Sequence, residues 1–145
     1  MKITAPVLFI LGSALVAVGY TSVSAQLPAS VLGGVYTDAQ AKRGEKVYAD
    51  NCVTCHGPKL QGTDTAGPTL SGPDFVSGWK DMTVAALLAK ISSDMPSNAP
   101  GTLKPEEYAD VLSFVLSSNK YPAGKTEMPT DPSALKGVKM AAAPK

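Results

Sequence analysis

The sequence predicts an all-α protein with three main helices joined by long loops. Three segments place apolar residues three and four positions apart, which is the spacing of an amphipathic helix. No segment shows the regular alternation of polar and apolar residues that is typical of a strand. The 13 glycines and 12 prolines indicate many turns, so the connections between the helices are expected to be loops.

The chain opens with a segment that is typical of an export leader. Lys2 provides a positive start, residues 3–18 are almost wholly apolar, and Val23-Ser24-Ala25 has the small-x-small pattern that signal peptidase recognises. An uncleaved membrane anchor is the alternative, because residues 3–23 carry no charge and could just span a bilayer. Two glycines in the apolar run and the placement of the cleavage pattern favour cleavage. Residues 1–25 are therefore predicted to be a signal peptide that directs the protein to the periplasm.

The remainder of the chain is neutral. The chain has 13 basic and 12 acidic side chains, and Lys2 leaves with the leader, so the mature net charge is zero. This balance does not indicate nucleic acid or an anionic membrane surface as a partner. The length fits one domain with one modest core. Because only 6% of the residues are aromatic, we expect a group other than side chains to fill part of the interior.

The first helix follows a lead-in, residues 26–36, that has no clear periodicity. Thr37 or Asp38 can cap the helix with a side-chain oxygen. The helix is expected to reach the two cysteines and to stop at Gly57-Pro58. Its predicted buried face consists of Ala41, Gly44, Val47 and Tyr48.

The second helix is predicted to follow a loop over residues 58–78 that is rich in glycine and proline. Thr83 is its expected N-cap, and the helix ends before Met95-Pro96, because a residue that precedes proline avoids helical geometry. Its apolar positions are Val84, Leu87, Leu88 and Ile91.

The third helix shows the clearest pattern. Pro105 suits the first helical position, and Glu106 and Glu107 lie in the first turn, where the helix dipole favours acidic side chains. The helix is expected to end near Asn119, and the last residues of the chain, 138–145, are expected to be disordered. The apolar stripe of this helix is Tyr108, Val111, Leu112, Val115 and Leu116.

Both cysteines and the single histidine of the chain lie within the pentapeptide from Cys52 to His56. A zinc site needs four ligands, and the chain has no second cysteine pair or second histidine. A thioredoxin-like pair places its reactive cysteine at a helix N-terminus, whereas here the helix precedes the motif. A structural disulfide between Cys52 and Cys55 remains open.

Covalent haem attachment is the interpretation that uses all three side chains. Two thiols about one helical turn apart can reach the two vinyl groups on one edge of a porphyrin, and the adjacent imidazole then lies under the iron. Export also fits this chemistry, although it fits a disulfide equally well. The motif predicts one haem c per chain, attached through Cys52 and Cys55, with His56 as an axial ligand of the iron.

A methionine is the expected second axial ligand, because thioether sulfur opposite imidazole fills both positions and raises the reduction potential. Met95 and Met128 both precede a proline and are both candidates. The local sequence favours Met95, since the following proline keeps it out of a helix and stiffens its loop. Met82 lies at the start of the second helix, and Met140 lies in the tail that is expected to be frayed.

The order of these motifs resembles the class I c-type cytochromes over about Thr37 to Asn119. The resemblance implies a cytochrome c fold, in which three main helices and their loops wrap around one covalently bound haem. The matches in chain order are Gly44-x-x-x-Tyr48, the motif Cys52 to Gly57, Gly67-Pro68-Thr69-Leu70, Trp79, Met95-Pro96, and Val111 with Phe114 in the last helix.

The resemblance also implies roles for single residues. Met95 would be the distal iron ligand, and the carbonyl of Pro68 would accept a hydrogen bond from His56. Trp79 would contact a haem propionate, although a lone tryptophan is often simply buried. In the same family Gly44 and Tyr48 meet the last helix near Val111 and Phe114, which is also what helix packing alone predicts.

The expected function is one-electron transfer rather than catalysis, because an iron with two axial ligands has no open position for a substrate. The expected organisation is a signal peptide over 1–25, a lead-in over 26–36, a cytochrome c domain over 37–119 and an extended tail over 120–145.

The expected partners are redox proteins. The lead-in and the "YPAG" stretch are similar to soluble periplasmic cytochromes that serve quinoprotein dehydrogenases, so the expected donor is such an enzyme and the acceptor an oxidase or another cytochrome. Neither nucleic acid nor, after cleavage of the leader, a membrane is expected to bind, and the protein is expected to be a monomer. The alternatives are a cytochrome subunit bound tightly to such a dehydrogenase, or a haem enzyme or sensor whose sixth ligand is labile.

Overall fold

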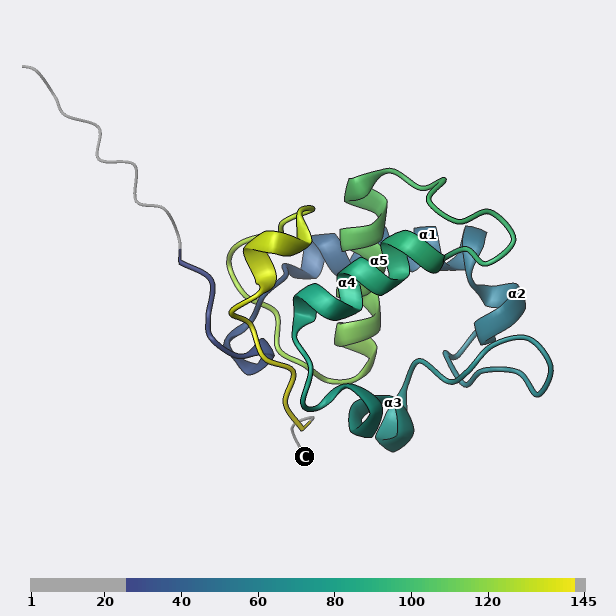
Figure 1. Ribbon diagram of the computed structural model, residues 1–145, viewed down its shortest axis with the longest axis horizontal. Coiled ribbons are helices and arrows are strands. Elements are labelled where there is room, and N and C mark those ends of the chain that lie inside the picture. The colour runs from purple at the N-terminus through teal and green to yellow at the C-terminus, as the bar shows by residue number, and fades with distance from the viewer. Residues whose placement is uncertain (1–25, 143–145) are drawn as a thin grey trace, which may run out of the picture.

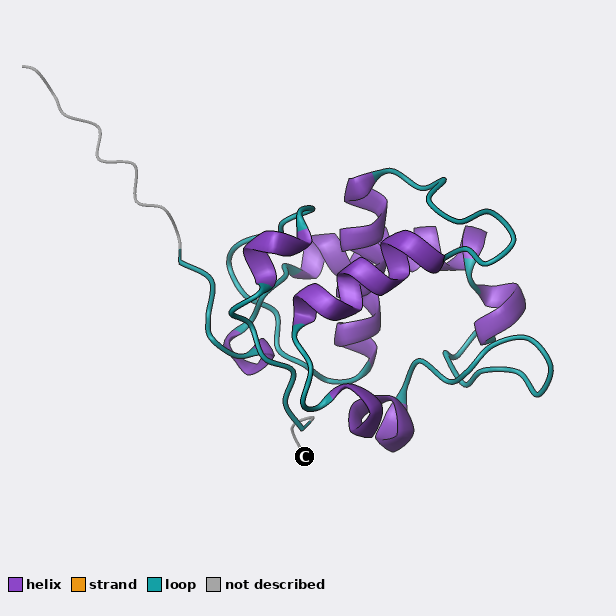
Figure 2. Cartoon of the chain, in the orientation of Figure 1, coloured by secondary structure: helices purple, strands orange, loops and turns teal. Residues whose placement is uncertain are grey.

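The computed structural model describes residues 26–142 (Figure 1), so the predicted signal peptide lies outside the described residues. Within this part of the chain the regular elements are all helices, with isolated β-bridges but no strand (Figure 2). The predicted all-α fold class is therefore confirmed. The α-helices are α1 (Asp38–Asn51), α2 (Val53–His56), α3 (Gly72–Trp79), α4 (Val84–Asp94) and α5 (Pro105–Ser118), and the 3-10 helices are η1 (Val31–Gly33) and η2 (Pro132–Leu135).

The first helix begins as predicted but is shorter than predicted. The Thr37 hydroxyl accepts a hydrogen bond from the Gln40 amide at 3.1 Å and caps α1. The helix ends at Asn51, because Cys52 (φ −120°) departs from helical geometry, and α2 follows as a separate turn. This break changes the direction of the chain between the two cysteines.

Helices α1 and α5 pack closely where Gly44 faces the backbone of α5. A Cβ atom at Gly44 would lie 2.9 Å from the Val111 amide nitrogen and would overlap the Asp110 carbonyl, so only glycine allows this approach. One turn further along α1, the rings of Tyr48 and Phe114 lie with centroids 5.3 Å apart. The expected meeting of these residues with the last helix is confirmed.

An ion-pair network ties the same two helices to the tail. The Arg43 guanidinium donates two hydrogen bonds of 2.9 Å to the Asp110 carboxylate and two of 2.9 and 3.0 Å to Glu127. Asp110 is buried, with 6% of its surface exposed. The bonds from Arg43 lower the pKa of Glu127. The contribution of Glu127 to stability is therefore present above its ordinary pKa and is lost as the pH falls through the lowered value.

Replacing Arg43 by methionine is expected to lower the free energy of unfolding by about 2 to 3 kcal/mol, because Asp110 is left buried without its counter-charge. The loss lies at the low end for a buried pair, since the Arg43 side chain is 48% exposed. Denaturant unfolding at neutral pH measures it. The matched control is Lys46→Met, which breaks the exposed pair with Asp50 and should cost clearly less, because an exposed ion pair contributes little to stability. Equal losses in the two variants would contradict the prediction.

Helix α3 corrects the predicted loop over residues 58–78. Pro73 lies in the first turn of α3, and Phe75 is buried, with 4% exposed. The side-chain oxygen of Asn119, at the end of α5, accepts a hydrogen bond of 2.9 Å from the Gly72 amide. Gly72, Pro73 and Gly78 lie within this helix and hide it in the sequence, and the burial of Phe75 against the core stabilises it.

The second and third predicted helices are confirmed as α4 and α5. The Thr83 hydroxyl accepts a hydrogen bond from the Ala86 amide at 3.1 Å, and α4 ends at Asp94, before Met95, whose backbone is extended (φ −119°, ψ 150°). Helix α5 starts at Pro105 and is followed by Asn119 as its C-cap. The Glu107 carboxylate accepts a hydrogen bond of 2.8 Å from the Lys104 amide, which stabilises the first turn.

The tail packs against the domain, which corrects the expected disorder of residues 138–142. Val138 and Met140 are 2% and 3% exposed. The Val84 amide donates to the Val138 carbonyl, and the Met140 amide donates to the Met82 carbonyl, both at 2.9 Å. The tail also lies beside the lead-in, because the Lys139 amide donates to the Ala29 carbonyl at 2.9 Å (Figure 1). Single apolar residues between prolines and glycines form no periodic pattern, so only the packing reveals their burial.

None of the helices within residues 26–142 has both the length and the apolar character that crossing a bilayer requires.

Candidate haem site

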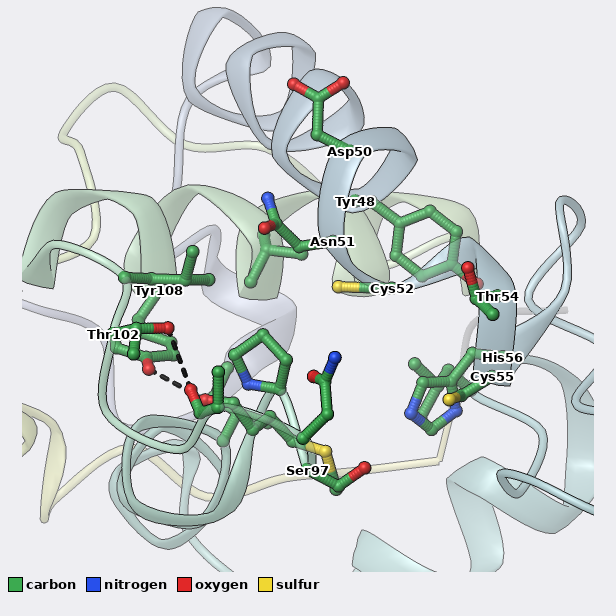
Figure 3. Close-up of a pocket in the computed structure, with 18 residues that line it drawn as sticks. Tyr48, Asp50, Asn51, Cys52, Thr54, Cys55, His56, Ser97, Thr102 and Tyr108 are labelled. Atoms are coloured by element: carbon green, nitrogen blue, oxygen red, sulfur yellow. Dashed lines mark hydrogen bonds between the residues drawn. The ribbon is translucent and has the colours of Figure 1, made fainter.

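A cavity of about 380 Å³ lies between α1 and α2 on one side and α5 with the loop after α4 on the other. Cys52, Cys55, His56 and Met95 all line it. Figure 3 shows the cysteines and the histidine around one common space. The structure therefore brings together the four side chains that the sequence analysis assigned to covalent attachment and axial ligation.

The two cysteines lie about one helical turn apart. The His56 amide donates to the Cys52 carbonyl at 2.9 Å, which closes the turn that carries Cys55. Both thiols are free and partly buried. Burial, and to a smaller extent the electrostatic effect of the neighbouring Cys55 thiol, raises the pKa of the Cys52 thiol to about 11. A reactive redox cysteine has a lowered pKa, so this environment disfavours the thioredoxin-like interpretation.

The imidazole of His56 is buried, with 7% exposed, and one of its nitrogens has a partner. Nδ1 lies 2.8 Å from the Pro68 carbonyl oxygen, which can only accept, so Nδ1 carries the proton. Nε2 is then left with its lone pair, the form in which imidazole binds a metal. Gly67 permits this contact, because a Cβ there would lie 2.9 Å from the Cys55 carbonyl and 3.1 Å from the ring.

Tyr48 supports the end of the motif from α1. Its hydroxyl donates a hydrogen bond of 2.6 Å to the carbonyl of Gly57, the residue at which α2 ends in the left-handed region (φ 73°). Burial raises the pKa of Tyr48 to about 12, so the phenol remains a donor at physiological pH. The turn that carries Cys55 and His56 is thus held to the preceding helix.

The methionines of the described residues occupy different environments. Met95 lines the cavity. Met128 is buried elsewhere in the core, where its amide donates to the Gln40 side chain at 2.7 Å and its carbonyl accepts from the same side chain at 3.2 Å. Met82 is 45% exposed, and Met140, in the tail, is buried against the domain. Among these candidates only Met95 shares a cavity with His56.

Trp79 ends α3, packs partly buried against the core and is not among the residues that line the cavity. Its contact with a haem propionate stays a prediction. Tyr108 is a cavity residue whose role the sequence analysis missed, because its place in the apolar stripe of α5 indicated packing alone. Its hydroxyl donates a hydrogen bond of 2.7 Å to the Met95 carbonyl.

The cavity has apolar walls and a polar rim with one charged side chain. The apolar residues are Leu70, Ile91, Leu103 and Val111. The uncharged polar residues are Asn51, Thr54, Ser97, Asn98 and Thr102. Asp50 also lines the cavity, and its carboxylate accepts a hydrogen bond of 2.8 Å from the Lys46 ammonium.

The comparison with known families identifies the chain. The model of the family described as cytochrome c oxidase, cbb3-type, subunit III matches residues 39–115. The chain belongs to this family of cytochrome c domains. The matched residues lie within the predicted domain over 37–119 and include both cysteines and His56.

Two individual proteins show more limited similarity. The chain is 40% identical over 40 residues to the Cbb3-type cytochrome c oxidase subunit CcoP of Azospirillum brasilense. Those residues make up 28% of this chain and 14% of that protein. The chain is also similar to a chain of the sulfane dehydrogenase SoxCD from Paracoccus pantotrophus, with a TM-score of 0.45 and 21% identity. That match covers 69% of this chain and 59% of the other. The chain thus spans less than two thirds of each relative.

The cytochrome domain carries a covalently attached haem c, as the family and the cysteine pair imply. The cavity fits such a group. It offers two thiols one turn apart, a buried imidazole whose other nitrogen has a carbonyl partner, and apolar walls. The predicted cofactor is therefore confirmed.

Proposed function

We propose that this cytochrome domain is a one-electron carrier in which His56 and Met95 are the axial ligands of the haem iron. One observation carries the proposal: Met95 and His56 line the same cavity as both cysteines, and Met128 does not. Haem c, when bound, supplies a one-electron redox couple whose potential depends on the axial ligands and on burial.

The protein's own residues supply rigid ligation. The hydrogen bond between His56 and the Pro68 carbonyl orients the imidazole and leaves Nε2 for the iron. The extended backbone of Met95 directs the chain out of α4, so its thioether is carried by a short loop rather than by a helix face. If both His56 and Met95 bind the iron, the haem would offer no open position for oxygen or a substrate, which favours electron transfer over catalysis.

The proposed location is the periplasm, which the leader over residues 1–25 supports. The proposed donor is a dehydrogenase, with a quinoprotein dehydrogenase as the favoured class. The proposed acceptor is a respiratory oxidase or another cytochrome, and the oxidase subunit in the family's description supports the first of these. A tightly bound cytochrome subunit of a dehydrogenase is the alternative within electron transfer.

The charge distribution favours docking through the cavity rim, whose one carboxylate, Asp50, is paired with Lys46, rather than through the basic side chains of α1. Lys42, Arg43 and Lys46 lie together on this helix. Arg43, however, is paired with Asp110 and Glu127, and Lys46 is paired with Asp50. Most of the positive charge is therefore neutralised within the molecule, and we infer that these residues form a solvated helix face.

Anaerobic mixing of the oxidised protein with quinoprotein dehydrogenases and their substrates tests the proposed function. Each protein molecule is expected to accept one electron, as followed by absorbance, and to pass it on when membranes that contain a terminal oxidase are added. The reduced protein alone is expected to react slowly with oxygen, because both axial positions are filled. Rapid consumption of oxygen by the reduced protein alone would favour the haem enzyme or sensor instead.

The same assay tests the docking surface. Lys42→Gln is expected to change the rate of reduction by less than about twofold at 0.1 M ionic strength, where exposed charges are largely screened beyond about 10 Å. The matched rim variant Asn98→Glu places a charge on an exposed cavity residue and should slow the reaction more than Lys42→Gln does. The opposite order would assign docking to the basic side chains of α1.

A further inference from the structure

We propose that Tyr108 is a positioning residue that holds Met95 in the geometry of an iron ligand. The proposal rests on the proposed ligation by Met95. Its starting point is the hydrogen bond of 2.7 Å from the Tyr108 hydroxyl to the Met95 carbonyl, which is drawn as a dashed line from Tyr108 in Figure 3. Tyr108 itself is buried, with 5% exposed, and lines the cavity.

The loop that carries Met95 is otherwise closed on itself. The Met95 amide continues the bonding of α4, donating to the Ile91 carbonyl at 3.1 Å. After it, the Ala99 amide donates to the Pro96 carbonyl at 2.8 Å, and the Thr102 hydroxyl donates to the Ala99 carbonyl at 2.8 Å. Of these hydrogen bonds, the one from the Tyr108 hydroxyl links the Met95 backbone to α5.

Helix α5 also positions the side of the cavity that carries Cys52 and Cys55, because α1 packs against it. Gly44 of α1 meets α5 at Asp110, two residues after Tyr108, and Arg43 bonds the Asp110 carboxylate. Helix α1 then leads directly into Cys52. The attachment side reaches α5 through this crossing, and the Met95 side reaches α5 through Tyr108, so the first turns of one helix set the separation between the two sides.

The consequence for the iron ligand follows from its weakness. A neutral thioether competes poorly with other ligands unless it is held in place, and outer contacts that orient a ligand contribute to its binding. Loss of the Tyr108 hydrogen bond frees the Met95 backbone while leaving the thioether in the chain. The iron–sulfur bond should then form less completely, and an added ligand should displace it more easily.

Tyr121 provides a matched control for a purely structural role. It is also buried, with 2% exposed, and its hydroxyl donates to a backbone carbonyl, that of Ala141, at 2.6 Å. It lies at the start of the tail, packs in the core and is not among the residues that line the cavity. Both Tyr108→Phe and Tyr121→Phe therefore remove a hydrogen bond from a tyrosine hydroxyl to a backbone carbonyl. Only the bond of Tyr108 is made to Met95.

The test measures imidazole binding to the oxidised, haem-loaded full chain by absorbance. Tyr108→Phe is expected to bind imidazole about fivefold more tightly than the unchanged protein. Imidazole competes with the Met95 thioether for the iron, and the loss of one hydrogen bond weakens the thioether by about that factor. Tyr121→Phe should bind imidazole as the unchanged protein does. Denaturant unfolding of both variants should show similar losses of stability, which separates ligand positioning from general stability.

A double variant isolates the effect on Met95. In a Met95→Ala background, Tyr108→Phe should change imidazole affinity by less than about twofold, because no thioether is left to compete. An unchanged affinity in Tyr108→Phe alone, or an equal change in both backgrounds, would overturn the positioning role while leaving the ligand assignment intact. Absence of the iron–sulfur charge-transfer band from the unchanged protein would overturn the ligand assignment itself, and the positioning role with it.

Discussion

Replacing Met95 by alanine is expected to abolish the iron–sulfur charge-transfer band of the oxidised protein and to let the reduced protein bind carbon monoxide rapidly and stoichiometrically. Met95 lines the cavity with His56 and both cysteines, and alanine offers no sulfur. The haem should remain attached, because Cys52 and Cys55 are unchanged. The reduction potential should fall, since the thioether is what raises it. Absorbance spectroscopy and redox titration measure these changes.

Met128→Ala is the matched control for this prediction. Met128 also precedes a proline, but it is buried in the core away from the cavity, with 2% exposed. Its loss should lower the free energy of unfolding by about 2 to 5 kcal/mol and leave the charge-transfer band in place. If Met128→Ala removed the band and Met95→Ala kept it, the ligand assignment would be wrong.

Gly44→Ala is expected to destabilise the protein by about 3 kcal/mol or more, at or above the upper end of the usual cost of overpacking. The added methyl group would overlap the Asp110 carbonyl and lie 2.9 Å from the Val111 amide, both of which are backbone atoms of α5. The helices can accommodate it only by moving apart, which also displaces Tyr48 from Phe114 and the cysteine turn from Tyr108. Denaturant unfolding measures the loss, and imidazole binding reports the change at the site.

Gly78→Ala provides the control within the same chain. Gly78 lies in α3, and a Cβ there would have no heavy atom within 4 Å. Alanine should therefore be neutral or stabilise the protein by up to about 1 kcal/mol, because it restricts the unfolded chain more than glycine does. Comparable losses in Gly44→Ala and Gly78→Ala would show that helical glycines in general, rather than the crossing, set the cost.

Local chemistry made most of the site predictable. Cys52, Cys55 and His56 are adjacent in the chain, so their spacing alone restricts the chemistry to a few choices. Met95-Pro96 combines a soft thioether with a helix stop. Tyr108 was not predictable as a site residue, because a tyrosine in an apolar stripe is typical of packing, and its hydroxyl partner is 13 residues away.

Helix α3 and the tail show the same difference. Phe75 and Met140 carry no periodic signal, and both are buried by contacts with residues that are distant in sequence. The predicted loop around α3 and the predicted disorder of residues 138–142 were wrong for this reason.

The sequence by itself determined the helical class, the capping residue Thr83, and the haem attachment motif, because each depends on residues within a few positions of one another. Only the tertiary structure decided which methionine shares a cavity with His56, that α5 is common to both sides of that cavity, and that the tail completes the core. These depend on how α1 crosses α5 at Gly44 and on side chains that meet across the fold. Local spacing limits the chemistry, and packing decides which of the remaining candidates come together.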